Sequence, residues 1–574
     1  MTAAVFAAQL CRANGGTGWA ATPLEYVASA HTCGKHSVLI ITARGNNRDV
    51  LKALTCAIEA GASKISVLTM SRTGKIAAMA NRWPNVEIHS FELPSGRDGF
   101  LATNSLVATM VVLAERSGCD VHGLHKPEQL TLASDVVDRP NLIVLYAGWS
   151  TSAAADLESK STEAALANVM LADYRNFGHG RHHWLAKHSA TTAVIALAAE
   201  LDSRLARQTL ELLPPAIPRQ LVDVHTNGPL ASIELLLKVF LIVDSYGQQR
   251  GIDPGRPGVP AFGSKLYHMA APSGRKSDPM AYCLAKKLRC PVGLVSRHPV
   301  YEEAKHGFLG LRREISQTSI KSIVLDYDGT ICRPDQREHG IGSEVVEDLV
   351  RLIDEGVIIG IATGRGKSVG EDLQTKIPRR CWPQIIVGYY NGSQIRELDS
   401  PSCLPVTAPI IEGVISRFTE RLRTDTALFA STDIHERPDH VSITFRDSTS
   451  LLWARQVILE YVAGWHEGGL KMVESSHSID VFSVDHSKTM VVSECARRSG
   501  IDEAKVIRIG DSGAWPGNDF ELLDCRLGLS VDSVSSSLQN CWNILPPGFQ
   551  GVAGARWYLQ RLRLSPKGHR FLLE

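Results

Sequence analysis

The chain has 574 residues and a formal charge of +1, from 61 basic and 60 acidic side chains. A single hydrophobic core stops growing at roughly 250 to 300 residues, so this length predicts several domains. The balanced charge and the lack of a dense Lys/Arg run argue against a nucleic-acid partner and favour a small anionic metabolite.

The cysteine pattern and the hydropathy indicate where the protein works. Twelve cysteines are scattered without C-x-x-C spacing, which is typical of reduced thiols. The first residues lack the basic region of a signal peptide, and the most apolar stretch, 229–246, is interrupted by Glu234, Lys238 and Asp244. We therefore expect a soluble, cytoplasmic protein with no membrane partner.

The first 270 residues alternate strand-like and helical patterns, which predicts two doubly wound α/β lobes in tandem, over 1–130 and 131–270. In the first lobe a strand pattern runs into the polar turn TARGNN and then into a helical pattern. The free N–H groups at the start of such a helix make an anion site. The candidate anion ligands in this turn are Arg44, Asn46 and Asn47.

This turn resembles the phosphosugar-binding loop of the sugar isomerase (SIS) superfamily, with an arginine and amides where that family carries hydroxyls. The chain begins too close to the turn to contain the family's first strand and its Gly-Ser turn. The resemblance therefore implies a first lobe that is reduced or truncated at its N-terminus. Domains of this family usually build their sites across a dimer, so a homodimer is expected.

The second lobe repeats the pattern with a strand over 141–148, a helix over 153–169 and a long apolar helix over 230–247. Its first strand, turn and helix resemble the isomerase half of glucosamine-6-phosphate synthase. That resemblance implies phosphate binding by Ser150 and Ser152. The implied isomerase residues are Glu163 as proton shuttle, His179 as ring-opening group and Lys265 as a loop lysine.

A carboxylate base and a ring-opening acid/base are what aldose–ketose isomerisation requires. An ordinary surface carboxylate at Glu163 and a structural histidine at His179 are the alternative interpretation. Two hypotheses therefore stay open for the N-terminal lobes. They isomerise a phosphosugar, or they form a non-catalytic phosphosugar sensor and dimerisation module.

Past a linker expected over 271–318, a new α/β pattern begins, is interrupted by a less regular region and then resumes. This layout predicts a Rossmann-like core over 319–393 and 477–549, with an inserted α/β cap over 394–476. Residues 550–574 are expected to form a C-terminal tail.

The sequence SIVLDYDGT places Asp326 and Asp328 directly after a buried strand. At the carboxyl end of a parallel strand both side chains face the crevice where ligands bind in open α/β sheets. Paired carboxylates there suit phosphoryl transfer, because one attacks phosphorus and the other protonates the leaving alcohol and later activates water. A helix cap or turn is the alternative for an isolated pair of this kind.

Three further segments follow in order and favour the catalytic interpretation. In VIIGIATGRGKS, the hydroxyl of Thr363 and the backbone around Gly364 can bind phosphate oxygens. In DHSKT, Lys488 can neutralise a pentacoordinate phosphoryl group. The last segment, VIRIGDSGAWPGNDF, carries oxygen ligands of the kind that Mg²⁺ prefers, namely Asp511, Asn518 and Asp519.

Together the four segments resemble the haloacid-dehalogenase (HAD) superfamily of phosphatases, and the inserted cap resembles its Cof-like subgroup, which commonly acts on sugar phosphates. The resemblance implies that Asp326 is the nucleophile and Asp328 the acid/base. The implied phosphate-binding residues are Thr363, Gly364 and Lys488. The implied Mg²⁺ ligands are Asp326, Asp328 through its backbone carbonyl, and Asp511.

One departure concerns the segment DSGAWPG, which puts more residues between Asp511 and Asn518 than the compact form of the subgroup. It predicts a loop variation, since both ends of the segment survive. Candidate cap residues for sugar hydroxyls are Glu474, Ser476 and His477. A phosphatase fold used only as a binding scaffold would predict loss of a carboxylate or of Lys488, and all are present.

Overall fold

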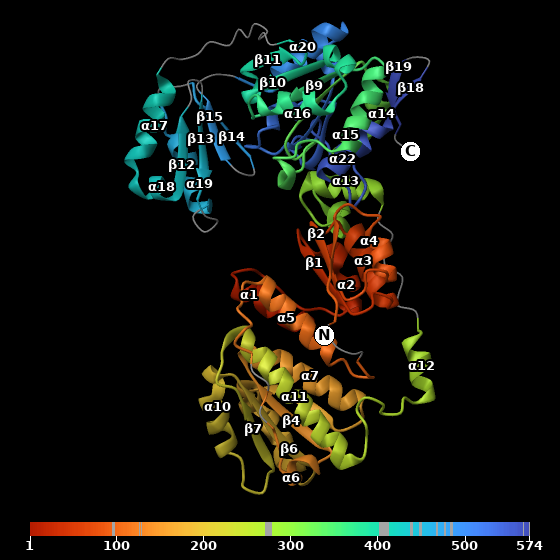
Figure 1. Ribbon diagram of the computed structural model, residues 1–574, viewed down its shortest axis with the longest axis vertical. Helices are drawn as coiled ribbons and strands as arrows, with labels where there is room; N and C mark the ends of the chain where they lie inside the picture. Colours follow the sequence, from red (N-terminus) through yellow and green to blue (C-terminus); the bar gives the residue numbers. More distant parts are fainter. Residues whose placement is uncertain are drawn as a thin grey trace.

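The computed structural model describes the chain except for residues 94–97, 125, 126, 128, 270–277, 401–412, 437–439, 447–450, 467, 468, 476, 477, 483–485, 566, 567, 573 and 574. The described residues form mostly parallel sheets covered by helices, so the expected α/β class is confirmed. Figure 1 shows the C-terminal core and its cap at one end, the first lobe in the middle and the second lobe at the other end.

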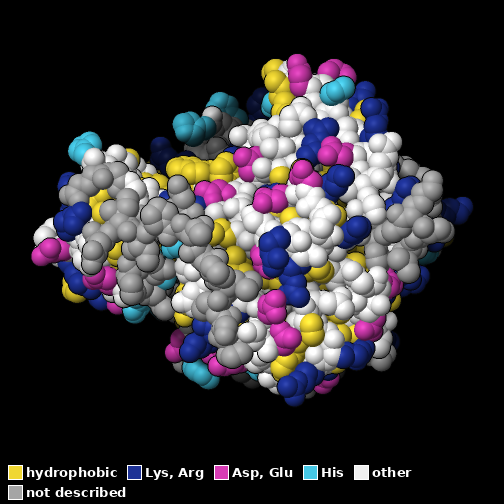
Figure 2. All heavy atoms as spheres, turned by 90° about the horizontal axis from the view of Figure 1, so that it is seen from above, with side chains coloured by type: hydrophobic (Ala, Val, Ile, Leu, Met, Phe, Trp, Pro, Cys, Tyr) yellow, Lys and Arg dark blue, Asp and Glu magenta, His cyan; other side chains and the backbone are white. Residues whose placement is uncertain are grey.

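The surface carries both signs of charge. Seen from the end that holds the C-terminal core, acidic and basic side chains intermingle on the visible face without an extended basic stripe (Figure 2). No helix among the described residues is long and apolar enough to cross a bilayer.

The first lobe is a three-stranded parallel sheet in the order β1-β2-β3. Its strands are β1 (Ser37–Thr42), β2 (Lys64–Thr69) and β3 (Val86–Ser90). Its helices are α2 (Pro23–Ser29), α3 (Arg48–Glu59) and α4 (Lys75–Ala80). Since the strands follow one another in chain order, this sheet never reverses direction, and a doubly wound order is found only in the two larger parallel sheets.

Two helices within residues 1–130, the range expected for the first lobe, pack on the second lobe. They are α1 (Thr2–Ala13) and α5 (Asn104–Arg116). Phe6 and Met110 from these helices share an apolar cluster with Ile233 and Leu236 of α11 (Gly228–Arg250). The boundary expected at residue 130 followed the restart of the strand pattern, which does not reveal that a helix crosses to the neighbouring lobe.

The second lobe has a four-stranded parallel sheet in the order β5-β4-β6-β7. Its strands are β4 (Asn141–Tyr146), β5 (Asn168–Asp173), β6 (Thr192–Ala198) and β7 (Arg219–Asp223). Besides α11, its helices include α6 (Ser134–Val137), α7 (Thr151–Glu163), α9 (His182–His188) and α10 (Glu200–Glu211). The helix expected over 153–169 thus ends at Glu163, and β5 takes over its last positions.

The C-terminal core begins earlier and ends later than expected. In place of a linker it has α13 (Pro279–Leu288), η5 (Val292–Arg297) and α14 (Tyr301–Gln317). In place of a tail it has α22 (Gly551–Arg561), β18 (Leu562–Ser565) and β19 (Gly568–Phe571). Phe308 and Leu311 of α14 and Tyr558 and Leu559 of α22 are buried in one apolar cluster with the strand residue Leu325, so these helices belong to the core.

The core sheet has six strands in the order β11-β10-β9-β8-β16-β17, all parallel except β11. The strands are β8 (Ser322–Asp326), β9 (Ile358–Ala362), β10 (Ile385–Tyr389), β11 (Gln394–Glu397), β16 (Ile507–Ser512) and β17 (Gly528–Ser533). The helices include α15 (Ser343–Asp354), α16 (Ser368–Lys376), α20 (Thr489–Ser499) and α21 (Phe520–Leu523). The strand order reverses between β8 and β16, which opens a crevice at their carboxyl ends.

The cap is a four-stranded antiparallel sheet in the order β12-β13-β15-β14. Its strands are β12 (Thr432–Glu436), β13 (His440–Phe445), β14 (Lys471–Glu474) and β15 (Ser478–Phe482), and its helices are α17 (Val414–Thr424), α18 (Thr426–Ser431) and α19 (Leu451–Ala463). The segment of β15 was expected to resume the core sheet, and β11 was expected in the cap. Ile479 and Val481 of β15 pack into the cap cluster instead, since alternating apolar residues suit either sheet.

Candidate active site

Three carboxylates meet where the core sheet reverses direction. Asp326 ends β8, Asp511 lies near the end of β16, and Asp519 directly precedes α21. One oxygen from each lies within 4.8 Å of the others. Residues separated by almost 200 positions in the sequence therefore share one crevice, because the ends of neighbouring parallel strands meet at one edge of the sheet.

Lys488 holds two of these carboxylates together. It lies at the start of α20, and its Nζ donates hydrogen bonds of 2.6 Å to Oδ1 of Asp326 and of 2.6 Å to Oδ1 of Asp519. All three side chains are buried. Burial alone would lower the pKa of Lys488, but the two carboxylates raise it above its usual value.

The cluster carries more negative than positive charge. Lys488 pairs with Asp326 and Asp519, while no described Lys or Arg forms an ion pair with Asp511. Burial and the neighbouring acids raise the pKa of Asp326 to about 7 and that of Asp511 to about 9. A buried acid that resists ionisation in this way fits a site completed by a cation.

The donor set fits Mg²⁺. Three carboxylates within reach of one point are hard oxygen ligands. Asn518 directly precedes Asp519, and its Oδ1 is buried without a hydrogen-bond partner. Gly329 leaves the room that Asp511 needs, since a Cβ at that position would lie 2.2 Å from Oδ2 of Asp511. The sequence placed Asp519 among the candidate oxygen ligands, and in the structure its carboxylate lies in the cluster.

Asp519 also fixes the strand end that carries Asp511. Its Oδ2 accepts the backbone N–H of Asp511 at 2.9 Å and that of Ser512 at 3.2 Å. A second positioning contact went unpredicted, because Thr330 donates a 3.1 Å hydrogen bond to Oδ2 of Asp326. Thr330 could have been predicted from the sequence, because it carries a hydroxyl four residues after Asp326 in a turn that returns toward the strand.

Asp328 lies beside the cluster rather than in it. Its carboxylate forms ion pairs with Nε of Arg337 at 3.3 Å and Nη1 of Arg365 at 3.5 Å, and neither arginine was predicted. The expected metal role of Asp328 concerned its backbone carbonyl, so the orientation of the side chain does not affect it. The two guanidinium groups hold the carboxylate at the rim of the crevice.

Thr363 follows β9, the strand next to β8, and is buried. Its hydroxyl accepts the backbone N–H of Arg365 at 3.0 Å, so it caps the turn that leaves the strand. Gly364 is exposed in this turn. The phosphate-binding role expected for both residues is compatible with this place at the carboxyl edge of the sheet.

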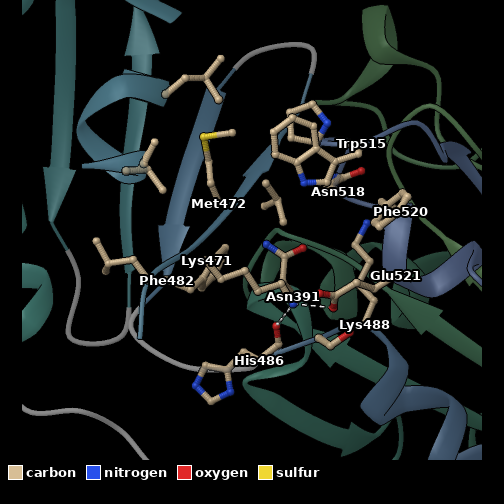
Figure 3. Close-up of a pocket in the computed structure, with 18 residues that line it drawn as sticks. Asn391, Lys471, Met472, Phe482, His486, Lys488, Trp515, Asn518, Phe520 and Glu521 are labelled. Atoms are coloured by element: carbon tan, nitrogen blue, oxygen red, sulfur yellow. Dashed lines mark hydrogen bonds and ion pairs between the residues drawn. The ribbon is translucent and has the colours of Figure 1, made fainter. Parts of the chain in front are cut away.

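A cavity of about 460 Å³ lies between the cap and the core and reaches Lys488. Figure 3 shows Trp515 and Met472 on its upper walls and Asn391 with Lys488 at its base. Lys471 of the cap reaches across to Glu521 and donates a 2.9 Å hydrogen bond to the backbone oxygen of His486.

The long loop predicted from DSGAWPG closes this cavity. The N–H of Glu474 on β14 donates to the carbonyl of Pro516 at 2.8 Å, and the N–H of Asn518 donates to the carbonyl of Glu474 at 3.1 Å. The carboxylate of Glu474 is bound by Nε of Arg455 at 2.8 Å, so it is engaged by another cap residue. The other two predicted cap candidates, Ser476 and His477, lie outside the described residues.

The structure does not bring Glu163 and His179 together within one chain. Strands β4 and β5 are parallel, and α7 returns from the carboxyl end of β4 to the amino end of β5. Glu163 ends α7 at the amino edge, whereas His179 follows β5 at the carboxyl edge. Strands of six residues separate these edges by roughly 20 Å, and both side chains are exposed.

The other candidate residues of the N-terminal lobes have structural partners. Ser150 is fully buried and donates to the carbonyl of Ala147 at 2.7 Å, and Ser152 is fully buried as well. Oδ1 of Asn47 accepts the N–H of Asp49 and so caps α3. Asn46 likewise accepts the first N–H of α4. The full burial of Ser150 and Ser152 argues against phosphate binding by their hydroxyls, whereas Asn46 and Asn47 serve as caps and their phosphate-binding role stays a prediction.

Two predicted cations of the N-terminal half remain exposed. Arg44 lies in the turn after β1, and Lys265 lies on α12 (Ala261–Tyr267), which stands apart from both lobes in Figure 1. Lys265 therefore does not complete a site with Glu163 or His179 in this chain.

No family model and no curated protein matches the chain. Solved structures similar to it include a haloacid dehalogenase-like hydrolase from Bacteroides thetaiotaomicron, at 19% identity over 37% of this chain and 88% of that one, with a TM-score of 0.28. They also include a glucosamine-6-phosphate deaminase from Thermotoga maritima, at 14% identity over 45% and 84%, with a TM-score of 0.37.

A tagatose-6-phosphate ketose/aldose isomerase from Escherichia coli is similar at 15% identity, over 45% of this chain and 83% of that one, with a TM-score of 0.37. Likenesses this remote carry no evidence of activity, which must come from the residues of this chain.

Proposed function

We propose that the chain is a Mg²⁺-dependent phosphomonoesterase that acts on a phosphosugar through an aspartyl-phosphate intermediate. The observation that carries the proposal is the cluster of buried Asp326, Lys488 and Asp519 with the partly buried Asp511, beside a cavity of about 460 Å³. A nucleophile, a counter-ion and a hard-oxygen site within one crevice are the parts that phosphoryl transfer requires.

In this mechanism Asp326 attacks phosphorus, and the bond from phosphorus to the leaving oxygen breaks. Asp328 must be protonated and released from its ion pairs with Arg337 and Arg365 when substrate binds, and it then gives its proton to the leaving alkoxide. As a carboxylate it next takes a proton from the water that attacks the aspartyl phosphate, which releases inorganic phosphate and regenerates Asp326. Lys488 and Thr330 fix the two oxygens of Asp326 and so orient it. Bound Mg²⁺ would neutralise charge on the phosphoryl oxygens, held by Asp326 and Asp511 with Asp519 in support.

The lining of the cavity supports a sugar as the leaving group. Trp515, which is 66% exposed, and Met472 offer an apolar wall, while Asn391 at the base and Asn518 beside Trp515 offer amides. A sugar ring has an apolar face and a hydroxylated edge, so it complements a pocket of this kind.

The N-terminal lobes are best interpreted as a non-catalytic phosphosugar-binding and dimerisation module. The opposite positions of Glu163 and His179 favour this alternative over the isomerase. A site made from these two residues would need two chains, and light scattering with an isomerase assay on hexose 6-phosphates tests that requirement directly.

The test of the phosphatase is phosphate release from a panel of sugar phosphates, with Mg²⁺ and with EDTA. Release that depends on Mg²⁺ and disappears in Asp326→Asn, but persists in Glu163→Gln, is the expected result. Release that survives Asp326→Asn would overturn the proposed nucleophile, and failure to release phosphate from any member would overturn the substrate class.

A further inference from the structure

The first lobe packs on the C-terminal core through the amino-terminal edge of its sheet. Trp83, just before β3, contacts Phe549 edge-to-face with ring centroids 6.5 Å apart. Gly61, just before β2, lies so close to the ring of Tyr282 that a Cβ there would be 2.5 Å from it. Gly293 approaches the backbone of His31 in the same way. These close approaches define a packed interface rather than a loose tether.

A cavity of about 880 Å³ lies within this interface and is larger than the one beneath the cap. The first lobe contributes the segments that precede its strands, including Lys35 and Asn85. Helix α13 contributes Lys286 and the residue after its end, Arg289. The core contributes Asp532 and reaches as far as Asp511 of the carboxylate cluster.

The side chains that face this cavity leave a surplus of positive charge. Lys35, Lys286 and Arg289 line it, while Asp511 belongs to the carboxylate cluster and Asp532 is the one other acid in the lining. Burial lowers the pKa of Lys286 to about 8, as expected where a cation lacks a full counter-charge.

Contacts within the protein satisfy only part of the hydrogen-bonding capacity of these cations. Nζ of Lys286 donates a 3.0 Å hydrogen bond to Oδ1 of Asn543, which uses one of its three donors. The carbonyls of Ser535, Asn540 and Cys541 are bound by the adjacent Lys287 instead. Lys35 and Arg289 are exposed and form no ion pair among the described residues, and Nη2 of Arg289 donates one long hydrogen bond, of 3.4 Å, to the carbonyl of Val534.

The cavity also holds an unpaired acceptor. Oδ1 of Asn85 is buried and has no hydrogen-bond partner, and the residue as a whole is only 9% exposed. A buried acceptor of this kind costs free energy unless a donor reaches it. Asp532 lies close enough to Lys35 and Lys286 to offset part of their charge, so the three cations of the lining exceed this one nearby carboxylate. An excess of cations and a buried acceptor together match a ligand that carries both an anionic group and a hydroxyl.

We propose that this cavity is a second ligand site, which binds a phosphorylated polyhydroxy compound between the first lobe and the core. The phosphate would lie against Lys35, Lys286 and Arg289, and a hydroxyl would donate to Asn85. The site lies at the opposite edge of the first sheet from Arg44, so it differs from the anion turn that the sequence suggested.

The same cavity couples the ligand to the carboxylate cluster. Trp515 lines both this cavity and the one beneath the cap, and Asp511 lines this cavity and also belongs to the carboxylate cluster. A ligand in the interface therefore touches the loop that closes the cavity beneath the cap. This coupling rests on the proposed phosphatase, whereas the binding itself does not.

The test is calorimetric titration of the full chain with glucose 6-phosphate in EDTA, which prevents turnover. The double substitution Lys35→Gln with Arg289→Gln is expected to weaken binding by about tenfold or more, since it removes two charge-assisted contacts. Arg44→Gln, a matched loss of one exposed cation at the other edge of the lobe, is expected to bind like the wild type. Asn85→Asp should weaken binding too, because it adds an anion.

Inorganic phosphate and glucose serve as separate probes in the same titration. Weaker binding of both than of glucose 6-phosphate supports a ligand that needs the anion and the hydroxyls, whereas equal binding of phosphate would overturn the polyhydroxy part. Unchanged affinity in the double variant, or loss of binding only in Arg44→Gln, would overturn the site. Phosphate release by the wild type with Mg²⁺ is measured in parallel, so failure of this site is distinguished from failure of the phosphatase.

Discussion

The two sets of residues expected to do chemistry differ in how the fold treats them. Asp326, Lys488 and Asp511 come from three separate segments and meet in one buried crevice. Glu163 and His179 are only sixteen positions apart, yet they lie on opposite edges of the second sheet and face solvent. Closeness in sequence therefore says less about a shared site than the edge of the sheet that each residue occupies.

The reason is the direction of parallel strands. A residue that directly follows a strand lies at the carboxyl edge, where the other strand ends also lie. A residue at the end of the returning helix lies at the opposite edge. Substitutions in the C-terminal core and in the second lobe test whether the two sets of residues differ in function. Their expected effects run from abolished turnover to a shift in the pH dependence of stability.

The largest effect is expected for Asp326→Asn. Loss of the nucleophile should lower kcat for phosphate release by on the order of 10⁴-fold or more, because an amide cannot form the covalent intermediate. Glu163→Gln is the matched carboxylate-to-amide control in the second lobe and should leave kcat unchanged. An equal loss of kcat in both variants would contradict the proposal that only the residues of the C-terminal core act in phosphate release.

Three of the core motifs were predictable because their chemistry-bearing residues lie at the end of a core strand or directly after it. Asp326, Thr363 and Asp511 could be placed at one edge from local patterns alone. The contacts of Asp328 with Arg337 and Arg365 were not predictable, since they depend on how two turns meet in space. The same is true of the loop of Trp515, whose backbone pairs with a cap strand.

The domain boundaries failed for a related reason. An amphipathic helix shows in its sequence that one face is buried, but not against what it is buried. Helices α13, α14 and α22 therefore resembled a linker and a tail, although their apolar faces complete the core. Segment β15 could not be assigned either, because its alternation fits the cap sheet and the core sheet equally well.

The next largest effect is expected for Lys488→Met. Removal of the ammonium leaves Asp326 and Asp519 buried without their counter-ion, which should lower the free energy of unfolding by about 3–5 kcal/mol. Urea denaturation in EDTA measures this change, and phosphate release should be lost as well.

Lys160→Met provides the matched control in the second lobe. Lys160 is 4% exposed and donates a 2.7 Å hydrogen bond to Asp156, so its loss should destabilise the protein to a similar degree. Phosphate release at a temperature where both variants are folded should persist in Lys160→Met alone. Loss of release in both variants would show that the effect of Lys488 is one of folding and not of the site.

A smaller effect is expected for Trp515→Ala. Loss of the aromatic wall should raise KM for hexose 6-phosphates by about tenfold, and by less for methyl phosphate, which has no ring to contact. Trp515→Phe should recover part of the affinity because it keeps a ring. Trp453 on α19 is also well exposed, at 46%, and lies outside the lining of both cavities, so Trp453→Ala is the control. Equal changes of KM for both substrates would refute a leaving-group contact.

The smallest effect concerns Lys286 and the pH dependence of stability. Its pKa is lowered to about 8 in the folded chain, whereas an unfolded lysine titrates near 10.4. Between these values the unfolded chain binds more protons, so this group makes the folded protein more stable as the pH rises. The Tm of the wild type relative to Lys286→Gln should therefore rise between pH 8 and pH 10 by on the order of a few degrees.

Glucose 6-phosphate in the interface cavity should reduce this pH dependence of the Tm difference, because a bound anion stabilises the charged lysine. If the Tm difference between the wild type and Lys286→Gln does not change with pH in the absence of ligand, the cavity does not disfavour the charged form of Lys286. The electrostatic reason to place an anion in the cavity would then be lost.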